Sequence, residues 1–180
     1  MTEAEWSGGS FRMLPERRID IRGRTLEPML LQWAGPTEIL ARALASAGWQ
    51  AAPPWTWASG IIQLDPATPL EKLPPRPSLH EGESAIATLY KTDPVNAGQR
   101  LVLRVWATDY SVSGERGAKP LSLVSLTVES KAEVRYLFAF PHATVPDQGL
   151  ANRVAGELRG LSPLQPVQVA QLPLLMSDKQ

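Results

Sequence analysis

Residues 100–110 carry the side chains of this chain that are best suited to binding a ligand. The pattern predicts a strand, and because side chains alternate along a strand, Arg104, Trp106 and Tyr110 share one face. An arginine two residues from a tryptophan can stack on it, hydrogen-bond a planar anion, or cover apolar surface with its stem. In the functional interpretation, Arg104 holds a phosphate or carboxylate, Trp106 forms an apolar wall, and Asp109 or Tyr110 adds a polar contact. In the structural alternative, Arg104 and Trp106 only pack against apolar neighbours.

Trp55 and Trp57 form a second candidate ligand-binding surface. They lie within residues 50–77, where seven prolines break regular structure repeatedly. Aromatic side chains in such a segment can build the wall of a ligand site or an interface. The alternative is that they lie in the core. The arginine at 76, between two prolines, is predicted to lie in an extended loop.

Few residues suit catalysis or metal binding. The chain has no cysteine, and its two histidines, His80 and His142, stand in no metal-like spacing with carboxylates. The sequence contains neither a nucleophile-elbow pattern nor a glycine loop in the context that a phosphate-cradling site requires. It therefore predicts no metal, no cofactor and no catalytic residue.

Length and composition predict one ordinary domain. The chain has 180 residues, of which 43% are hydrophobic, and 18 Lys and Arg side chains balance 18 Asp and Glu. Since there is no net positive charge, nucleic acid is not an expected partner. No apolar run approaches the roughly 20 residues that a membrane-spanning helix needs. Residues 1–13 are predicted as a linker or flexible arm, 14–175 as the domain and 176–180 as a tail.

The order of predicted elements favours an α+β fold. A strand over 29–33 precedes a helix that begins near Pro36 and ends at Gly48. After the proline-rich segment come strand candidates and a second helix, which are, in chain order, strands 84–90, 100–108, 121–129 and 134–140, helix 147–159 and strand 167–172. The economical arrangement is a mainly antiparallel sheet of about five or six strands with two or three helices in a single domain.

Two tryptophan-bearing segments carry a family resemblance. The first runs from Leu31-Gln32-Trp33-Ala34-Gly35 to Gly48-Trp49 and Pro53-Pro54-Trp55; the second is Leu101-Val102-Leu103-Arg104-Val105-Trp106 with Asp109-Tyr110. Over roughly 14–129 the chain resembles the LssY C-terminal domain, a bacterial module of unknown function. Where many relatives carry histidines, this chain has Arg100-Leu101-Val102-Leu103. The resemblance implies a soluble appendage of a DedA-type or type 2 phosphatidic-acid-phosphatase-type membrane protein.

These observations predict a non-catalytic accessory or binding domain of a bacterial membrane protein of lipid or phosphate metabolism. Its expected partners are a membrane-embedded domain or protein and a phosphate- or carboxylate-bearing ligand. We expect it to lie at the membrane, on the cytoplasmic side. The alternative is a hydrolase or transferase that acts on a phosphorylated or lipid-like substrate through Arg104, Asp109 and His80.

Overall fold

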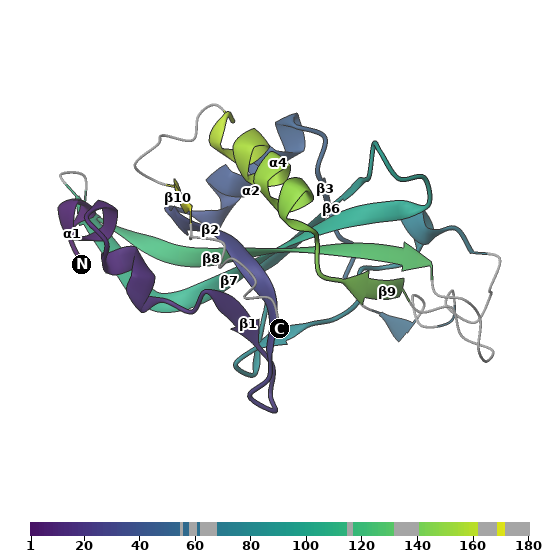
Figure 1. Ribbon diagram of the computed structural model, residues 1–180, viewed down its shortest axis with the longest axis horizontal. Helices are drawn as coiled ribbons and strands as arrows, with labels where there is room; N and C mark the ends of the chain where they lie inside the picture. Colours follow the sequence, from purple (N-terminus) through teal and green to yellow (C-terminus); the bar gives the residue numbers. More distant parts are fainter. Residues whose placement is uncertain are drawn as a thin grey trace.

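An antiparallel sheet forms one layer of the protein, and helices α2 (Thr37–Ser46) and α4 (Gln148–Arg159) lie together over one of its faces (Figure 1). The computed structural model describes residues 1–54, 56–57, 61, 68–114, 117–131, 141–161 and 169–171. Within them the path through the sheet is β1-β2-β8-β7-β6-β3, with β9 beside β8 and β10 beside β2. The bounds of these strands are β1 Arg17–Ile19, β2 Thr25–Ala34, β3 Gln50–Ala51, β6 Ala87–Thr92, β7 Gln99–Gly114, β8 Gly117–Lys131, β9 Pro141–Thr144 and β10 Val169–Gln171. A separate hairpin joins β4 (Leu79–His80) to β5 (Glu83–Ser84).

The architecture confirms the predicted α+β class with its mainly antiparallel sheet and covering helices. The predicted strands 84–90, 100–108 and 121–129 correspond to β6, β7 and β8. Within the described residues the sheet contains eight strands, of which β3 and β9 have only two and four residues and are too short to show alternation. The predicted strand over 134–140 and the predicted boundary at 175 lie outside the described residues.

The two longest strands, β7 and β8, pair with each other at the centre of the sheet and set the geometry of the site. Their register places Arg100 opposite Glu129 and Arg104 opposite Ser125. The register shifts between Ala107 and Ser111. A bulge of this kind bends a strand and redirects its side chains, so Asp109 and Tyr110 leave the regular alternation of the strand.

The face beneath α2 and α4 contains the larger apolar core. Leu101, Leu103 and Val105 of β7 are buried there, as their alternation predicts. Trp33 and Trp49 are buried in the same cluster. Helix α4 begins where predicted, because the Asp147 carboxylate accepts a hydrogen bond from the Leu150 N–H at 2.8 Å.

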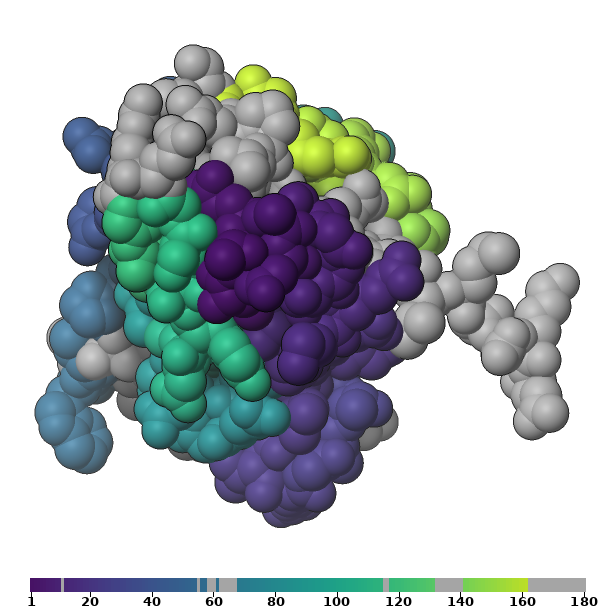
Figure 2. Space-filling view, turned by 90° about the vertical axis from the view of Figure 1, so that its left-hand side faces the viewer, coloured from purple at the N-terminus to yellow at the C-terminus, as the bar shows by residue number. Residues whose placement is uncertain are grey.

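The predicted linker over residues 1–13 is a wrong prediction. This segment contains helix α1 (Glu3–Ser7) and the 3-10 turn η1 (Ser10–Met13). Thr2 and Glu5 form a capping box at the start of α1, and Trp6 is 1% exposed. Trp6 packs with residues of β2, β7 and β8, and Figure 2 shows the purple N-terminal atoms against the green atoms of the β7–β8 hairpin. Burial of a large aromatic ring therefore fixes a segment whose glycines and serines suggested flexibility.

The loop between β6 and β7 contains a buried carboxylate, Asp93, that makes the stability of the fold depend on pH. The buried Asp93 carboxylate accepts hydrogen bonds from the Val95 N–H and the Asn96 side chain, both at 2.9 Å. Burial acts to raise the pKa of Asp93, but these hydrogen bonds and the charge of Arg153 outweigh it and hold the pKa below its ordinary value.

The Asp93 carboxylate is therefore expected to stabilise the protein above the unfolded-state pKa of about 3.9 and to lose this contribution as pH falls through the lowered pKa. The free energy of unfolding of wild type should exceed that of Asp93→Asn by a constant amount between neutral pH and about pH 5, and the difference should shrink below about pH 4. Urea unfolding of both proteins across this range measures it. A difference that grows on acidification would contradict the argument.

Candidate functional site

A buried ionic cluster lies on the sheet face opposite α2 and α4. The Glu129 carboxylate on β8 accepts hydrogen bonds from Arg100 Nη2 at 2.7 Å and Arg104 Nη2 at 3.0 Å. The side chains are 0% exposed for Glu129 and 2% exposed for both arginines. Strand register explains the contact, since Arg100 faces Glu129 directly and Arg104 follows four residues later on the same face.

The same arginines fix an extended chain segment across the sheet. Arg100 Nη1 donates to the backbone carbonyls of Leu70 and Leu73, and Arg104 Nη2 donates to the carbonyl of Arg76 at 2.7 Å. In return, the Arg76 N–H donates to Glu129 at 3.0 Å. Because neither guanidinium is free to move, residues 70–76 are held in one place over the sheet.

A second ion pair extends the cluster. Arg18 Nε on β1 donates to Glu27 on β2, and Arg18 Nη1 donates to the Leu79 carbonyl. Burial lowers the pKa of Arg104 below its ordinary value, while Glu129 and Glu27 oppose this shift and Arg18 adds to it. The Arg18–Glu27 pair and the two pairs of Glu129 therefore belong to one electrostatic unit, with three buried guanidinium groups and two buried carboxylates. One positive charge remains in excess.

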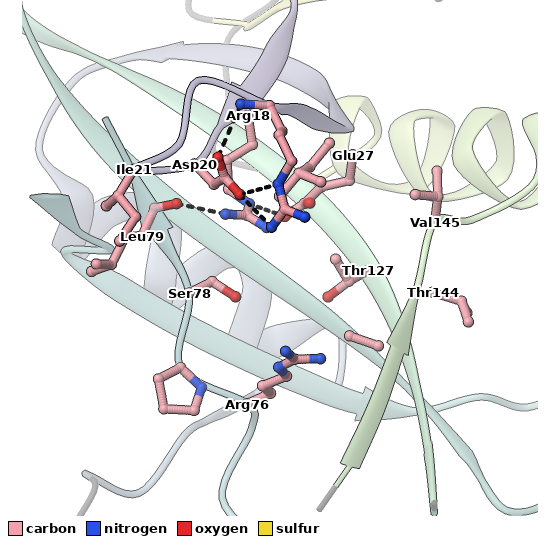
Figure 3. Close-up of a pocket in the computed structure, with 14 residues that line it drawn as sticks. Arg18, Asp20, Ile21, Glu27, Arg76, Ser78, Leu79, Thr127, Thr144 and Val145 are labelled. Atoms are coloured by element: carbon pink, nitrogen blue, oxygen red, sulfur yellow. Dashed lines mark hydrogen bonds and ion pairs between the residues drawn. The ribbon is translucent and has the colours of Figure 1, made fainter. Parts of the chain in front are cut away.

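A cavity of about 490 Å³ opens beside this cluster. Arg18 and Glu27 form one side of it, and Arg76, Ser78 and Thr127 contribute polar groups that point toward a common space (Figure 3). The Thr127 hydroxyl accepts a hydrogen bond from Arg104 Nη1 at 2.6 Å, so its own proton is available to donate into the cavity.

Arg76 is an exposed cation on the wall of this cavity. Its guanidinium has no hydrogen-bond or ion-pair partner among the residues that the structure describes. Arg24, also on the wall, is neutralised by Asp20 at 2.7 Å. The Thr144 hydroxyl, also on the wall, donates to the Val128 carbonyl at 3.4 Å. The cavity therefore offers the hydroxyls of Ser78 and Thr127 and one guanidinium that has no partner among the described residues, above a buried positive charge.

Arg104 does not line this cavity of about 490 Å³, but it lines a neighbouring cavity of about 520 Å³ together with Arg76. It acts on the first cavity through Thr127 and the Arg76 carbonyl, while its own side chain is buried. Sequence reasoning identified Arg104 from its neighbour Trp106, but their side-chain partners differ. The indole N–H of Trp106 donates to the Ser125 hydroxyl at 3.0 Å.

Trp106, Asp109 and Tyr110 come together at a separate cavity of about 460 Å³, which His80 also lines. The rings of Trp106 and His80 meet edge to face with centroids 5.8 Å apart. The Ile19 N–H donates to His80 Nδ1 at 3.2 Å, so a neutral His80 ring carries its proton on Nε2. Three of the four residues predicted on or near this strand therefore share one cavity, and Arg104 lines neither this cavity nor the one beside Thr127.

The remaining predicted residues lie in the proline-rich segment. The Trp57 side chain is 94% exposed, which suits contact with a ligand or partner, and its binding role stays a prediction. Trp55 lies outside the described residues. In the part of the chain that the structure describes, no group of histidine and acidic side chains could hold a metal ion.

Arg76, Ser78 and Thr127 were missed as site residues. A signal for Thr127 was present, because Ser125, Thr127 and Glu129 place polar side chains at every second position of the otherwise apolar stretch 123–129. For Arg76 the signal was the pair of flanking prolines, which fix φ on either side and hold the chain extended.

Three comparisons relate this chain to known proteins. A family model described as LssY C-terminus matches residues 11–148, which include every residue of the cavities described above. Searches of curated proteins and of solved structures each found no match. None of the described helices has the length and hydropathy that a membrane span requires. Because the family model covers well over half of the sequence, the resemblance seen in the tryptophan segments is confirmed: the chain belongs to the LssY C-terminus family.

Proposed function

We propose that this domain binds a phosphate- or carboxylate-bearing ligand in the cavity of Arg76, Ser78 and Thr127. The observation that carries the proposal is the Arg76 guanidinium, which has no partner among the described residues and lies beside a buried cluster with one excess positive charge. Guanidinium groups bind such anions through paired, charge-assisted hydrogen bonds.

Electrostatics favour an anion at this place. The excess charge of the cluster is buried, so water and salt screen it less than they screen a surface charge. An anion in the cavity would compensate this charge and would receive hydrogen bonds from Arg76 and from the Ser78 and Thr127 hydroxyls. Arg104 then serves as a positioning residue, since it holds Thr127 and the Arg76 backbone in place.

In this proposal the domain is a non-catalytic accessory part of a bacterial membrane protein of lipid or phosphate metabolism, and it faces the cytoplasm. Support for the membrane-embedded partner comes from the family resemblance, in which the module usually follows membrane-embedded segments. The exposed Trp57 ring offers a contact surface for such a partner.

The alternative, a hydrolase or transferase, would draw on His80 and Asp109. A histidine that serves as general base in a triad donates its Nδ1–H to an orienting acid. His80 instead accepts a hydrogen bond at Nδ1 from the Ile19 backbone, and within the described residues no hydroxyl is bonded to it. This geometry favours binding over catalysis.

Arg76→Ala is expected to weaken binding of ethyl phosphate by roughly ten- to hundredfold, since a hydrogen bond to a charged group contributes about 1.5–3 kcal/mol. Isothermal titration calorimetry at low salt measures the change. Arg22→Ala is the matched control, because Arg22 is exposed in the nearby β1–β2 turn but does not line the cavity. If the Arg76 and Arg22 variants bound ethyl phosphate with equal affinity, the anion site would not lie in this cavity.

A further inference from the structure

Apolar side chains surround the cavity of Arg76 at its opening. Ile21 is 72% exposed, Val145 is 55% exposed and Leu79 is 36% exposed, and all three line this cavity. They come from three separate parts of the chain, namely the β1–β2 turn, the end of β9 and strand β4. In Figure 3, Ile21 and Leu79 lie together on one side of the cavity and Val145 lies on the opposite side.

This gathering of apolar groups is not the ordinary scatter of a protein surface. Nine large hydrophobic side chains are exposed among the described residues, and three of them line this one cavity. Single exposed apolar residues need no explanation, but apolar groups that collect around a polar site point to a ligand that buries them.

We propose that the ligand is an amphiphile: a phosphate monoester carried on a hydrocarbon chain, as in a lipid phosphate. The phosphate group lies against Arg76, Ser78 and Thr127, and the hydrocarbon chain lies against Ile21, Leu79 and Val145. This inference rests on the proposed function, because it takes the cavity of Arg76 as the anion site and names the class of molecule that fills it.

The polar groups match a phosphate monoester better than a carboxylate. A phosphate monoester presents three terminal oxygens, and three separate donor groups point into the cavity from Arg76, Ser78 and Thr127. A carboxylate has only two oxygens, so one of them would have to accept hydrogen bonds from two of these donor groups. The monoester also carries the larger negative charge, close to −2 at neutral pH, beside the excess positive charge of the cluster.

The apolar side chains of Ile21, Leu79 and Val145, which form an apolar rim around the cavity, distinguish a lipid phosphate from a small phosphate as its ligand. A free phosphate or a small ester would bond to the polar groups of the cavity but would leave Ile21 and Val145 exposed to water. A hydrocarbon chain would cover them, and each buried methylene raises affinity by roughly fourfold. The rim therefore predicts that affinity rises with chain length while the polar contacts stay the same.

The test compares ethyl phosphate with octyl phosphate by calorimetry, using octyl glucoside as the amphiphile without a phosphate. Wild type is expected to bind octyl phosphate at least about tenfold more tightly than ethyl phosphate and to bind octyl glucoside far more weakly. In the double variant Ile21→Ser, Val145→Ser, ethyl phosphate should bind as in wild type and the advantage of the octyl chain should be lost. Val95→Ser is the matched control, since Val95 is 66% exposed but lies on the β6–β7 loop and does not line the cavity.

The outcomes keep the two proposals apart. Equal affinity for ethyl and octyl phosphate, or an octyl advantage that survives the double variant, would overturn the amphiphile and leave the anion site standing. Octyl phosphate that binds equally well to wild type and Arg76→Ala, or no better than octyl glucoside, would overturn the anion site and the amphiphile with it. Circular dichroism of each variant checks that the fold is intact, and the exposure of Ile21 and Val145 makes a folding defect unexpected.

Discussion

Replacing Glu129 with alanine is expected to lower the free energy of unfolding by about 3–5 kcal/mol, because breaking a buried ion pair leaves its partners charged and unpaired in a dry environment. Here one carboxylate serves two guanidinium groups, Arg100 and Arg104, and also accepts from the Arg76 N–H. The loss should exceed that of any exposed ion pair in the protein. Urea unfolding at neutral pH, followed by tryptophan fluorescence, measures it.

The matched control is Glu157→Ala, which removes the ion pair between Glu157 and Lys91. These side chains are 34% and 27% exposed, so the control should cost below about 1 kcal/mol. Glu129→Gln adds a milder change, since its amide keeps one oxygen acceptor and the side-chain shape, and it should fall between the two. If Glu129→Ala cost no more than Glu157→Ala, the buried cluster would not be an energetic unit.

Trp6→Ala is expected to destabilise the protein by about 3–5 kcal/mol, the range for truncating a buried tryptophan. The Trp6 indole fills the core formed with β2, β7 and β8, and its N–H donates to Gln32 at 2.7 Å. The variant loses both the burial of the indole ring and its hydrogen bond to Gln32. Thermal and urea unfolding measure the change.

Trp57→Ala provides the comparison at the opposite extreme of exposure. Its side chain is almost fully in solvent, so the change in the free energy of unfolding should stay within about 0.5 kcal/mol. A similarly small effect of Trp6→Ala would mean that residues 1–13 contribute nothing to the core, as a linker would.

Local periodicity accounts for the parts of the fold that could be predicted. Leu101, Leu103 and Val105 alternate along a strand, and the structure buries all three beneath the helices. Helix α2 follows from Pro36 at its start and from Gly48, whose φ of 85° suits the residue after a helix end. Such signals lie within a few residues of each other, so a single sequence shows them.

The N-terminal helix had a local signal that composition obscured. Thr2 and Glu5 have the spacing of a capping box, which marks a helix start. The burial of Trp6 could not be read locally, because its neighbours on β7 and β8 lie about a hundred residues away. Glycines and serines at 7–10 then favoured the wrong interpretation.

The candidate site depends on contacts that no local pattern contains. Arg104 meets Thr127, Glu129 and the Arg76 carbonyl, each more than 20 residues distant in sequence. Charge types alone did not reveal that Arg104 would bond to three protein groups while the Arg76 guanidinium has no partner among the described residues. The pairing of arginines with acceptors is decided by sheet register, and register is a property of the assembled fold.

The packing of α1 against the far end of the β7–β8 hairpin has a consequence for synthesis on the ribosome. Glu3 pairs with Lys119, which is 116 residues later in the chain. At roughly 5–20 residues per second, about 6–23 s pass between the synthesis of these two residues. During that interval Trp6 lacks the strands that bury it and remains open to chaperones. Completion of β8 therefore determines when helix α1 acquires its final surroundings.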